Sequence, residues 1–240
     1  MSNVRTVSDT KRAFYTHHTR PVNSIYRRVV EELMVEMHLL SVNAEYRYDP
    51  IYALGVVTTF DRFMQGYRPE ADRISIFNAL CRAIEDDPQR YRQDAEQLQA
   101  EAAELSADDL IAKIESLPHA HEAGIQGHLR AIAENPQFKY SRLFAIGLYT
   151  LLECADAEIV KDEKRLNAAL ETCCQALNLS VDKASKDLEL YRSNLEKIEQ
   201  ARVVLEDMLA ADRKKREQRE QDKAAKQDGV PLSSSESSDT

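Results

Sequence analysis

Two stretches near the start of the chain, RPVNSIYRRVVEELMVEMHLL (residues 20–40) and YDPIYALGVVTTFDRFMQGYRPEADRISIFNALCRAI (48–84), have the pattern of amphipathic helices. Apolar residues recur every three or four positions, which places them on one face of a helix. The pattern is interrupted at Pro21, Pro50 and Pro69, and proline is tolerated in the first turn of a helix but not in its interior. The first third of the chain is therefore predicted to be a series of short helices.

The same signals continue to residue 226 and predict an all-α protein. Asp49 stands as a cap before a proline, Ser106 and Asp109 have the spacing of a capping box, and Ser8 or Thr10 is expected to cap the first helix. Six glycines and seven prolines are too few for the tight turns of a β-sandwich or barrel. The predicted helices cover about residues 8–15, 23–40, 51–65, 69–84, 89–105, 106–116, 118–136, 140–155, 162–177 and 181–226.

One of these helices, residues 140–155, is apolar on nearly every face. A helix of this kind is normally the central, buried one, so we expect it at the middle of a helical bundle. Its most apolar run, LFAIGLYTLL (143–152), has about ten residues, whereas a helix needs about twenty to span a bilayer. This segment is therefore not expected to cross a membrane.

The last predicted helix, residues 181–226, differs from the others because it contains no glycine and no proline. Apolar residues follow the alternating three- and four-residue steps of a coiled coil, with only Arg202 interrupting them. From Asp212 onward the apolar stripe ends, so that part is expected to be solvated or bound to a partner. The predicted seam consists of Leu188, Tyr191, Leu195, Ile198, Leu205 and Leu209.

The chain of 240 residues is thus predicted to be a multi-helix bundle followed by a long, coiled-coil-like C-terminal helix. We place the bundle at residues 1–178, the long helix at 179–226 and a tail at 227–240. The tail is rich in serine and low in complexity, which is typical of a disordered segment.

Charge is distributed unevenly along the chain. The net charge of −9 disfavours general binding to nucleic acid, which needs cations against phosphates. Residues 1–30 nevertheless carry six Lys and Arg against one acid, and residues 212–226 carry seven against four. The N-terminal cations are expected either to touch an anionic membrane surface or to pair with acids inside the bundle, and the sequence leaves both possibilities open.

No catalytic motif is present. The chain lacks a P-loop, a G-x-G-x-x-G fingerprint, a G-x-S-x-G elbow and the Glu-x-x-His pairs of a di-metal bundle. His121 and His128 fall on one side of a helix, with His119 nearby, but no acid or cysteine stands at ligand spacing beside them. No enzyme activity, metal or cofactor is therefore expected.

The remaining histidines and the cysteines are interpreted as structural. His17 and His18 stand among basic residues and are expected in a surface or turn position, and His38 is expected to be half-buried with its hydrogen bonds satisfied. Four cysteines without metal spacing indicate thiols in the core of a protein from a reducing compartment. They are Cys81, Cys154, Cys173 and Cys174.

Several segments resemble the thylakoid formation protein family, the photosystem II biogenesis factors of cyanobacteria and plastids. The resemblance rests on RPVNSIYRRVVEELMVEMHLL, YDPIYALGVVT, FDRFMQGY, IFNALC and KYSRLFAIGLYTLLE, and covers the bulk of the chain. It implies an all-α protein that acts in thylakoid organisation and in photosystem II assembly and repair, together with the membrane AAA+ protease that removes damaged subunits. The family has no catalytic motif to carry over, and the lack of a presequence fits a cyanobacterial member.

The resulting hypothesis is a helical adaptor, attached peripherally on the cytoplasmic side of the thylakoid membrane with a soluble pool. Its partners would be the membrane AAA+ protease, photosystem II subunits or both, with no nucleic acid. The expected contact is an exposed seam on the C-terminal helix, or the basic extension beyond Asp212 if the bundle covers that seam. The seam residues predicted to bind the partner are Leu188, Leu195, Ile198, Leu205 and Leu209.

Two alternatives remain open at this stage. The chain is also compatible with a carrier that holds a pigment or small ligand between apolar helices near Tyr140–Leu152, with His38 or His128 as an axial-type ligand. A third possibility is homo-oligomerisation through the coiled-coil seam.

Overall fold

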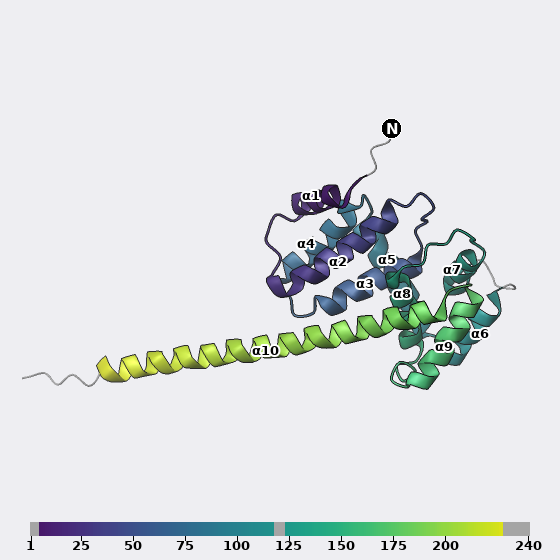
Figure 1. The fold of residues 1–240 in the computed structure, drawn as a ribbon. Coiled ribbons are helices and arrows are strands. Elements are labelled where there is room, and N and C mark those ends of the chain that lie inside the picture. The colour runs from purple at the N-terminus through teal and green to yellow at the C-terminus, as the bar shows by residue number, and fades with distance from the viewer. Residues whose placement is uncertain (1–4, 118–122, 228–240) are drawn as a thin grey trace, which may run out of the picture. The chain divides into compact units, whose positions relative to one another are not determined.

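The computed structural model describes residues 5–117 and 123–227, and gives the backbone alone for Leu205, Leu209 and residues 220–227. The described part consists of helices and loops without a β-strand, which confirms the predicted all-α class (Figure 1). The helices are α1 (Val7–His17), α2 (Ser24–Ser41), α3 (Pro50–Phe63), α4 (Glu70–Ala83), α5 (Pro88–Ala103), α6 (Ala107–Glu115), α7 (Gly124–Ala133), α8 (Arg142–Ala155), α9 (Glu163–Ala176) and α10 (Val181–Gln227).

Side-chain caps fix most of the helix starts. The Asp49 carboxylate accepts the backbone N–H of Tyr52 at 2.7 Å and so caps α3. Ser106 and Asp109 exchange side-chain and backbone hydrogen bonds at the start of α6. Both caps were predicted, because a short polar side chain satisfies backbone donors that a first turn leaves free.

The start of α1 differs from the prediction. Thr6 caps this helix in a capping box with Asp9, whereas Ser8 and Thr10 lie inside the helix. Thr10 is instead fully buried and takes part in a contact between helices. The sequence offered three hydroxyl residues within five positions, and only the tertiary contact decides which one is the cap.

Helices α3 and α8 cross at the centre of the bundle at a distance that only glycine permits. A Cβ added to Gly55 would lie 1.7 Å from the carbonyl oxygen of Leu143, and one added to Gly147 would lie 2.0 Å from that of Ile51. The pairing of 55 with 143 and of 51 with 147 means that the two helices run in opposite directions at the crossing. Every residue of the predicted central segment 143–152 is buried, which confirms its position in the core.

The chain divides into two compact units, residues 1–195 and 196–240. The first therefore extends beyond the predicted boundary at residue 178, because the first turns of α10 belong to it: Ala184, Leu188 and Tyr191 are buried. Within this unit α1 lies along α4 and α2, and α9 lies beside α6 (Figure 1). The described part of the second unit is the remainder of α10.

Candidate functional site

The predicted seam on α10 is not uniformly exposed. Leu188 is only 2% exposed and belongs to the core, which corrects its assignment to an exposed edge. Leu195 and Ile198 are half-buried, and the side chains of Leu205 and Leu209 lie outside the described residues. Partner binding by the last four residues therefore stays a prediction, and Leu188 is available only to the bundle.

Tyr191 shows why the early seam is covered. Its ring packs against Phe63 of α3 and Tyr149 of α8, with centroids 5.7 and 6.3 Å apart. Burial raises the pKa of the Tyr191 hydroxyl to about 12. An ion pair between Arg62 and Glu153 joins α3 to α8. The first turns of α10 thus complete an aromatic cluster that begins on the two central helices.

Polar contacts hold the same part of α10 beside this aromatic cluster. The Tyr140 hydroxyl donates to Asp187 at 2.8 Å, and the Lys183 ammonium lies 4.6 Å from the centroid of the Tyr140 ring. Nearby, Arg142 at the start of α8 forms an ion pair with Glu36 of α2. Burial raises the pKa of Glu36 although the Arg142 guanidinium opposes the shift. Removing Arg142 would leave this half-buried carboxylate unpaired, so the ion pair is needed where Glu36 lies.

The second unit presents a different surface. Val203, Val204 and Met208 are 47, 53 and 63% exposed, which is unusual for three large apolar side chains within six residues. The cations at residues 213–216 and Arg219 are exposed as well. This unit therefore offers apolar and basic side chains to solvent, and we treat it as the candidate interaction surface.

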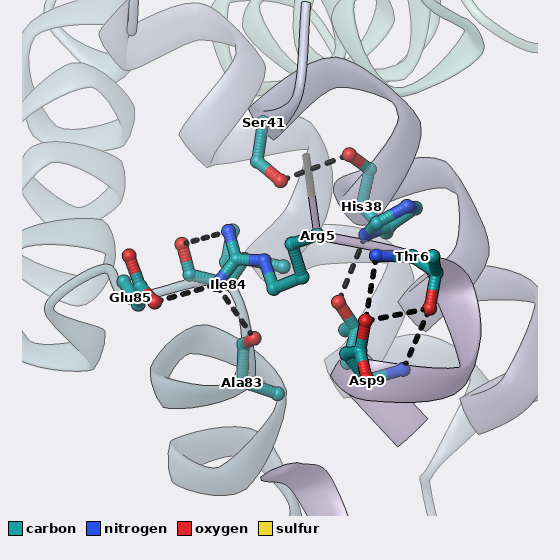
Figure 2. A network of polar contacts seen from close by, with 9 residues as sticks. Arg5, Thr6, Asp9, His38, Ser41, Ala83, Ile84 and Glu85 are labelled. Atoms are coloured by element: carbon teal, nitrogen blue, oxygen red, sulfur yellow. Dashed lines mark hydrogen bonds and ion pairs between the residues drawn. The ribbon is translucent and has the colours of Figure 1, made fainter. Parts of the chain in front are cut away.

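A separate polar network fixes α1 to the bundle (Figure 2). The Arg5 guanidinium donates to the carbonyl oxygens of Ala83 and Ile84 at 3.2 and 3.1 Å and pairs with Glu85 at 3.2 Å. These carbonyls stand at the C-terminus of α4, where the helix dipole favours a cation. Arg5 is thus a C-terminal cap supplied by a distant part of the chain.

The other N-terminal cations are also compensated. Four more of the six contact a carboxylate, and Arg27 donates to the carbonyl oxygen of Val22. This arrangement favours the second of the two readings left open by the sequence, in which these cations pair within the bundle. The ion pairs are Lys11–Glu31, Arg12–Asp9, Arg20–Asp72 and Arg28–Glu32.

Two histidines are buried at the edges of α1. The Thr10 hydroxyl and Nδ1 of His38 are 2.8 Å apart, and Nδ1 of His18 lies 3.0 Å from the Ser75 hydroxyl. Burial lowers the pKa of both rings. His38 is as predicted in its satisfied hydrogen bond and more deeply buried than predicted. His18 corrects the surface assignment, because α1 ends against α4 and carries the ring inward.

Comparison with known proteins adds the family. A family model described as thylakoid formation protein matches residues 6–220. The chain belongs to the thylakoid formation protein family. The resemblance inferred from the helical segments is confirmed, and the match extends into α10 as far as residue 220.

Relatives and a solved structure agree with this assignment to the thylakoid formation family. Protein Thf1 of Nostoc punctiforme is 66% identical over 94% of this chain and 96% of its own length. Protein Thf1 of Trichormus variabilis is 65% identical over 92% of this chain and 95% of its own. A structure of Psb29 has a TM-score of 0.77 and 45% identity, covering 88% of this chain and 98% of that one.

The described residues of this family member show neither a membrane span nor a metal cluster. None of the described helices combines the length and the apolar character needed to cross a membrane. No three His, Cys, Asp or Glu side chains of the described part gather as metal ligands, and His119 and His121 lie outside it. All four cysteines are free thiols, three of them buried and Cys154 half-buried.

The places that the sequence suggested for a pigment offer little room among the residues that the structure describes. His38 is committed to Thr10 in the core. His128 lines a pocket of about 130 Å³ together with Tyr48, Asp49 and Phe138, whereas pockets for drug-sized ligands begin at about 300 Å³. Along the central helix, the backbone contacts of α8 with α3 leave no space for a ligand between them.

Proposed function

We propose that this protein is a non-enzymatic adaptor of the thylakoid membrane. The first unit is the scaffold, and the part of α10 beyond Leu195 is the contact for partners. The partners are the membrane AAA+ protease, photosystem II subunits or both, and attachment is peripheral on the cytoplasmic side. The family's link to thylakoid formation supports the location at the thylakoid membrane. The burial of the first turns of α10 and the exposure of Val204 and Met208 support the assignment of the first unit as scaffold and of the rest of α10 as contact.

One observation carries this proposal: α10 has 47 residues, but among its described side chains those that are buried lie in its first turns. A helix in a protein gains its stability mostly from packing an apolar face, and the side chains of Val204 and Met208 are exposed instead. A helix that keeps large apolar side chains in solvent is typical of a binding element. The rigid first unit, with its compensated charges, is typical of a scaffold.

Capture from membranes tests the proposal. Immobilised protein is cross-linked in detergent-solubilised thylakoid membranes, using the full chain and a truncation after Leu195. We expect the full chain alone to capture the protease or photosystem II subunits. The truncation removes none of the α10 side chains that the structure describes as buried, so its first unit should melt like that of the full chain. Equal capture by both proteins would move the site to the bundle and refute the assignment to α10.

A further inference from the structure

Residues 196–219 of α10 segregate their charges between two faces. Successive residues on a helix are rotated by about 100°, which divides this segment into two opposite halves. One half contains four cations and a single acid, Asp212, whereas the other contains three cations and five acids. We call the first half the basic-apolar face; it consists of Lys197, Ile198, Ala201, Val204, Met208, Ala211, Asp212, Lys215, Arg216 and Arg219, with Leu205 and Leu209 left out because their side chains are not described.

The opposite half has more acids than cations, and one of its cations is paired. There the Arg202 guanidinium is 3.7 Å from Glu199 and 3.9 Å from Glu206, and it reaches both along the helix. The cations of the basic-apolar face make no ion pair with any other side chain that the structure describes, and all four are exposed. The basic-apolar face therefore carries four cations against one acid, a net charge of +3, whereas the opposite half carries three against five, a net charge of −2, with Arg213 and Lys214 exposed among those acids.

Apolar and basic side chains on one face suit a surface that is itself apolar beneath an anionic layer. Long Lys and Arg side chains can lay their stems along apolar neighbours and direct their charges to phosphate groups. Val204 and Met208 lie between the cations of the segment, at 53 and 63% exposure. A groove on a protein would favour an unbroken apolar stripe, which Asp212 and the flanking cations of this face interrupt.

We propose that the basic-apolar face of α10 lies on the surface of an anionic lipid membrane. The helix would lie in the plane of the headgroups along about 36 Å, the length of 24 residues at 1.5 Å each. The acidic half would then point to the aqueous phase. This inference rests on the proposed function in one respect, since it supplies the means of the peripheral attachment stated there.

Vesicle sedimentation with matched charge variants tests the orientation. The full chain should sediment with vesicles of phosphatidylglycerol and phosphatidylcholine at low salt, and stay in solution with phosphatidylcholine alone. Lys215→Glu with Arg219→Glu changes the basic-apolar face, and Arg213→Glu with Lys214→Glu makes the same change of charge on the other face. We expect the first pair to weaken vesicle binding on the order of thirtyfold, and the second pair far less. Equal effects of the two pairs, or no binding by the unmodified chain, would overturn the proposal.

A second pair of variants tests the apolar contribution. Met208→Ser lies on the basic-apolar face and Val203→Ser on the other, and both side chains are exposed, so neither change should disturb the fold. We expect Met208→Ser alone to weaken vesicle binding, by several fold. If both serine variants bind like the unmodified chain, the apolar side chains do not enter the lipid and the proposal fails in this form.

The same variants separate this inference from the adaptor function. Capture of protein partners from detergent-solubilised membranes involves no bilayer, so it should survive Lys215→Glu with Arg219→Glu. Loss of that capture with vesicle binding intact would assign the face to a protein partner and overturn the lipid proposal. Loss of vesicle binding with capture intact supports it. Failure of the full chain to capture any partner counts against the adaptor function alone.

Discussion

At the scale of single residues, Asp49 is a common kind of helix cap whose carboxyl group has an unusual pKa. Its carboxylate caps α3 and also lines the pocket beside Tyr48, His128 and Phe138. Burial raises the pKa of Asp49 to about 7, from an ordinary value of 3.8. The folded chain therefore binds a proton at this site more tightly than the unfolded chain does.

This shift predicts a pH dependence of stability. The stabilising contribution of the Asp49 proton is complete below about pH 3.8 and is lost as the pH rises through about 7. Asp49→Asn keeps a good N-cap and removes the titration. We expect the free energy of unfolding of the unmodified chain to fall relative to that of the variant between about pH 4 and pH 7. Above about pH 7 the difference between the two should stay constant. Urea unfolding across this range measures the difference, and a difference independent of pH would contradict the assignment.

The residues that sequence analysis misplaced share a cause. His18 was placed at the surface because its neighbours in sequence are charged, yet its ring is turned inward by the packing of α1 on α4. Leu188 and Ile198 both lie on the predicted seam, but only Leu188 reaches the core. In both cases the local pattern is correct, and burial depends on a partner that lies far away in sequence.

At the scale of helices, the crossing of α3 and α8 is the contact least tolerant of change. Gly55→Ala and Gly147→Ala would each drive a methyl group into a backbone carbonyl, which cannot move as a flexible side chain can. We expect each variant to lose about 3 kcal/mol or more in the free energy of unfolding, measured by urea titration.

Gly127→Ala in the partly exposed helix α7 is the matched control for these glycine variants. Replacing a helical glycine by alanine there should be neutral or gain up to about 1 kcal/mol. Losses of similar size at all three positions would show that the crossing is not the tight contact described.

Most helices could be predicted from their caps and apolar spacing, because both signals are local. The depth of α8 was also predictable, since apolar residues on every side leave a helix no exposed face. The close contact of α3 and α8 at two glycines could not be predicted, because a glycine in a helical pattern is equally compatible with a position that only weakens the helix. Only the structure shows that Gly55 of α3 faces the carbonyl oxygen of Leu143 in α8 and that Gly147 of α8 faces the carbonyl oxygen of Ile51 in α3.

At the scale of the whole molecule, α10 serves the two units differently, and truncating its apolar side chains should show this. Leu188→Ala removes a core contact and is expected to cost about 2–5 kcal/mol of stability, whereas Met208→Ala should change it by no more than about 0.5 kcal/mol. Urea unfolding followed by circular dichroism measures both. A comparable loss for Met208→Ala would mean that the bundle covers that side chain.

The candidate interaction surface could be predicted only in outline. The heptad pattern predicts that α10 is the helix that binds a partner, and the end of the apolar stripe at Asp212 is visible in the sequence. The point at which α10 leaves the core was not, because it is set by Tyr191 and its aromatic neighbours on α3 and α8. The site therefore begins later on the helix than the seam does.

Because residues 196–219 are one uninterrupted stretch of α10, the apolar and basic side chains of the basic-apolar face keep fixed angles to one another around the helix. Deleting a single residue between Val204 and Lys215 would turn the later cations by about 100° around the helix and take them off the side on which Val204 lies. Deleting seven residues would restore the direction to within about 20° while shortening the helix by about 10 Å. This part of the helix can thus be shortened by two turns with its faces nearly preserved, but not by a single residue.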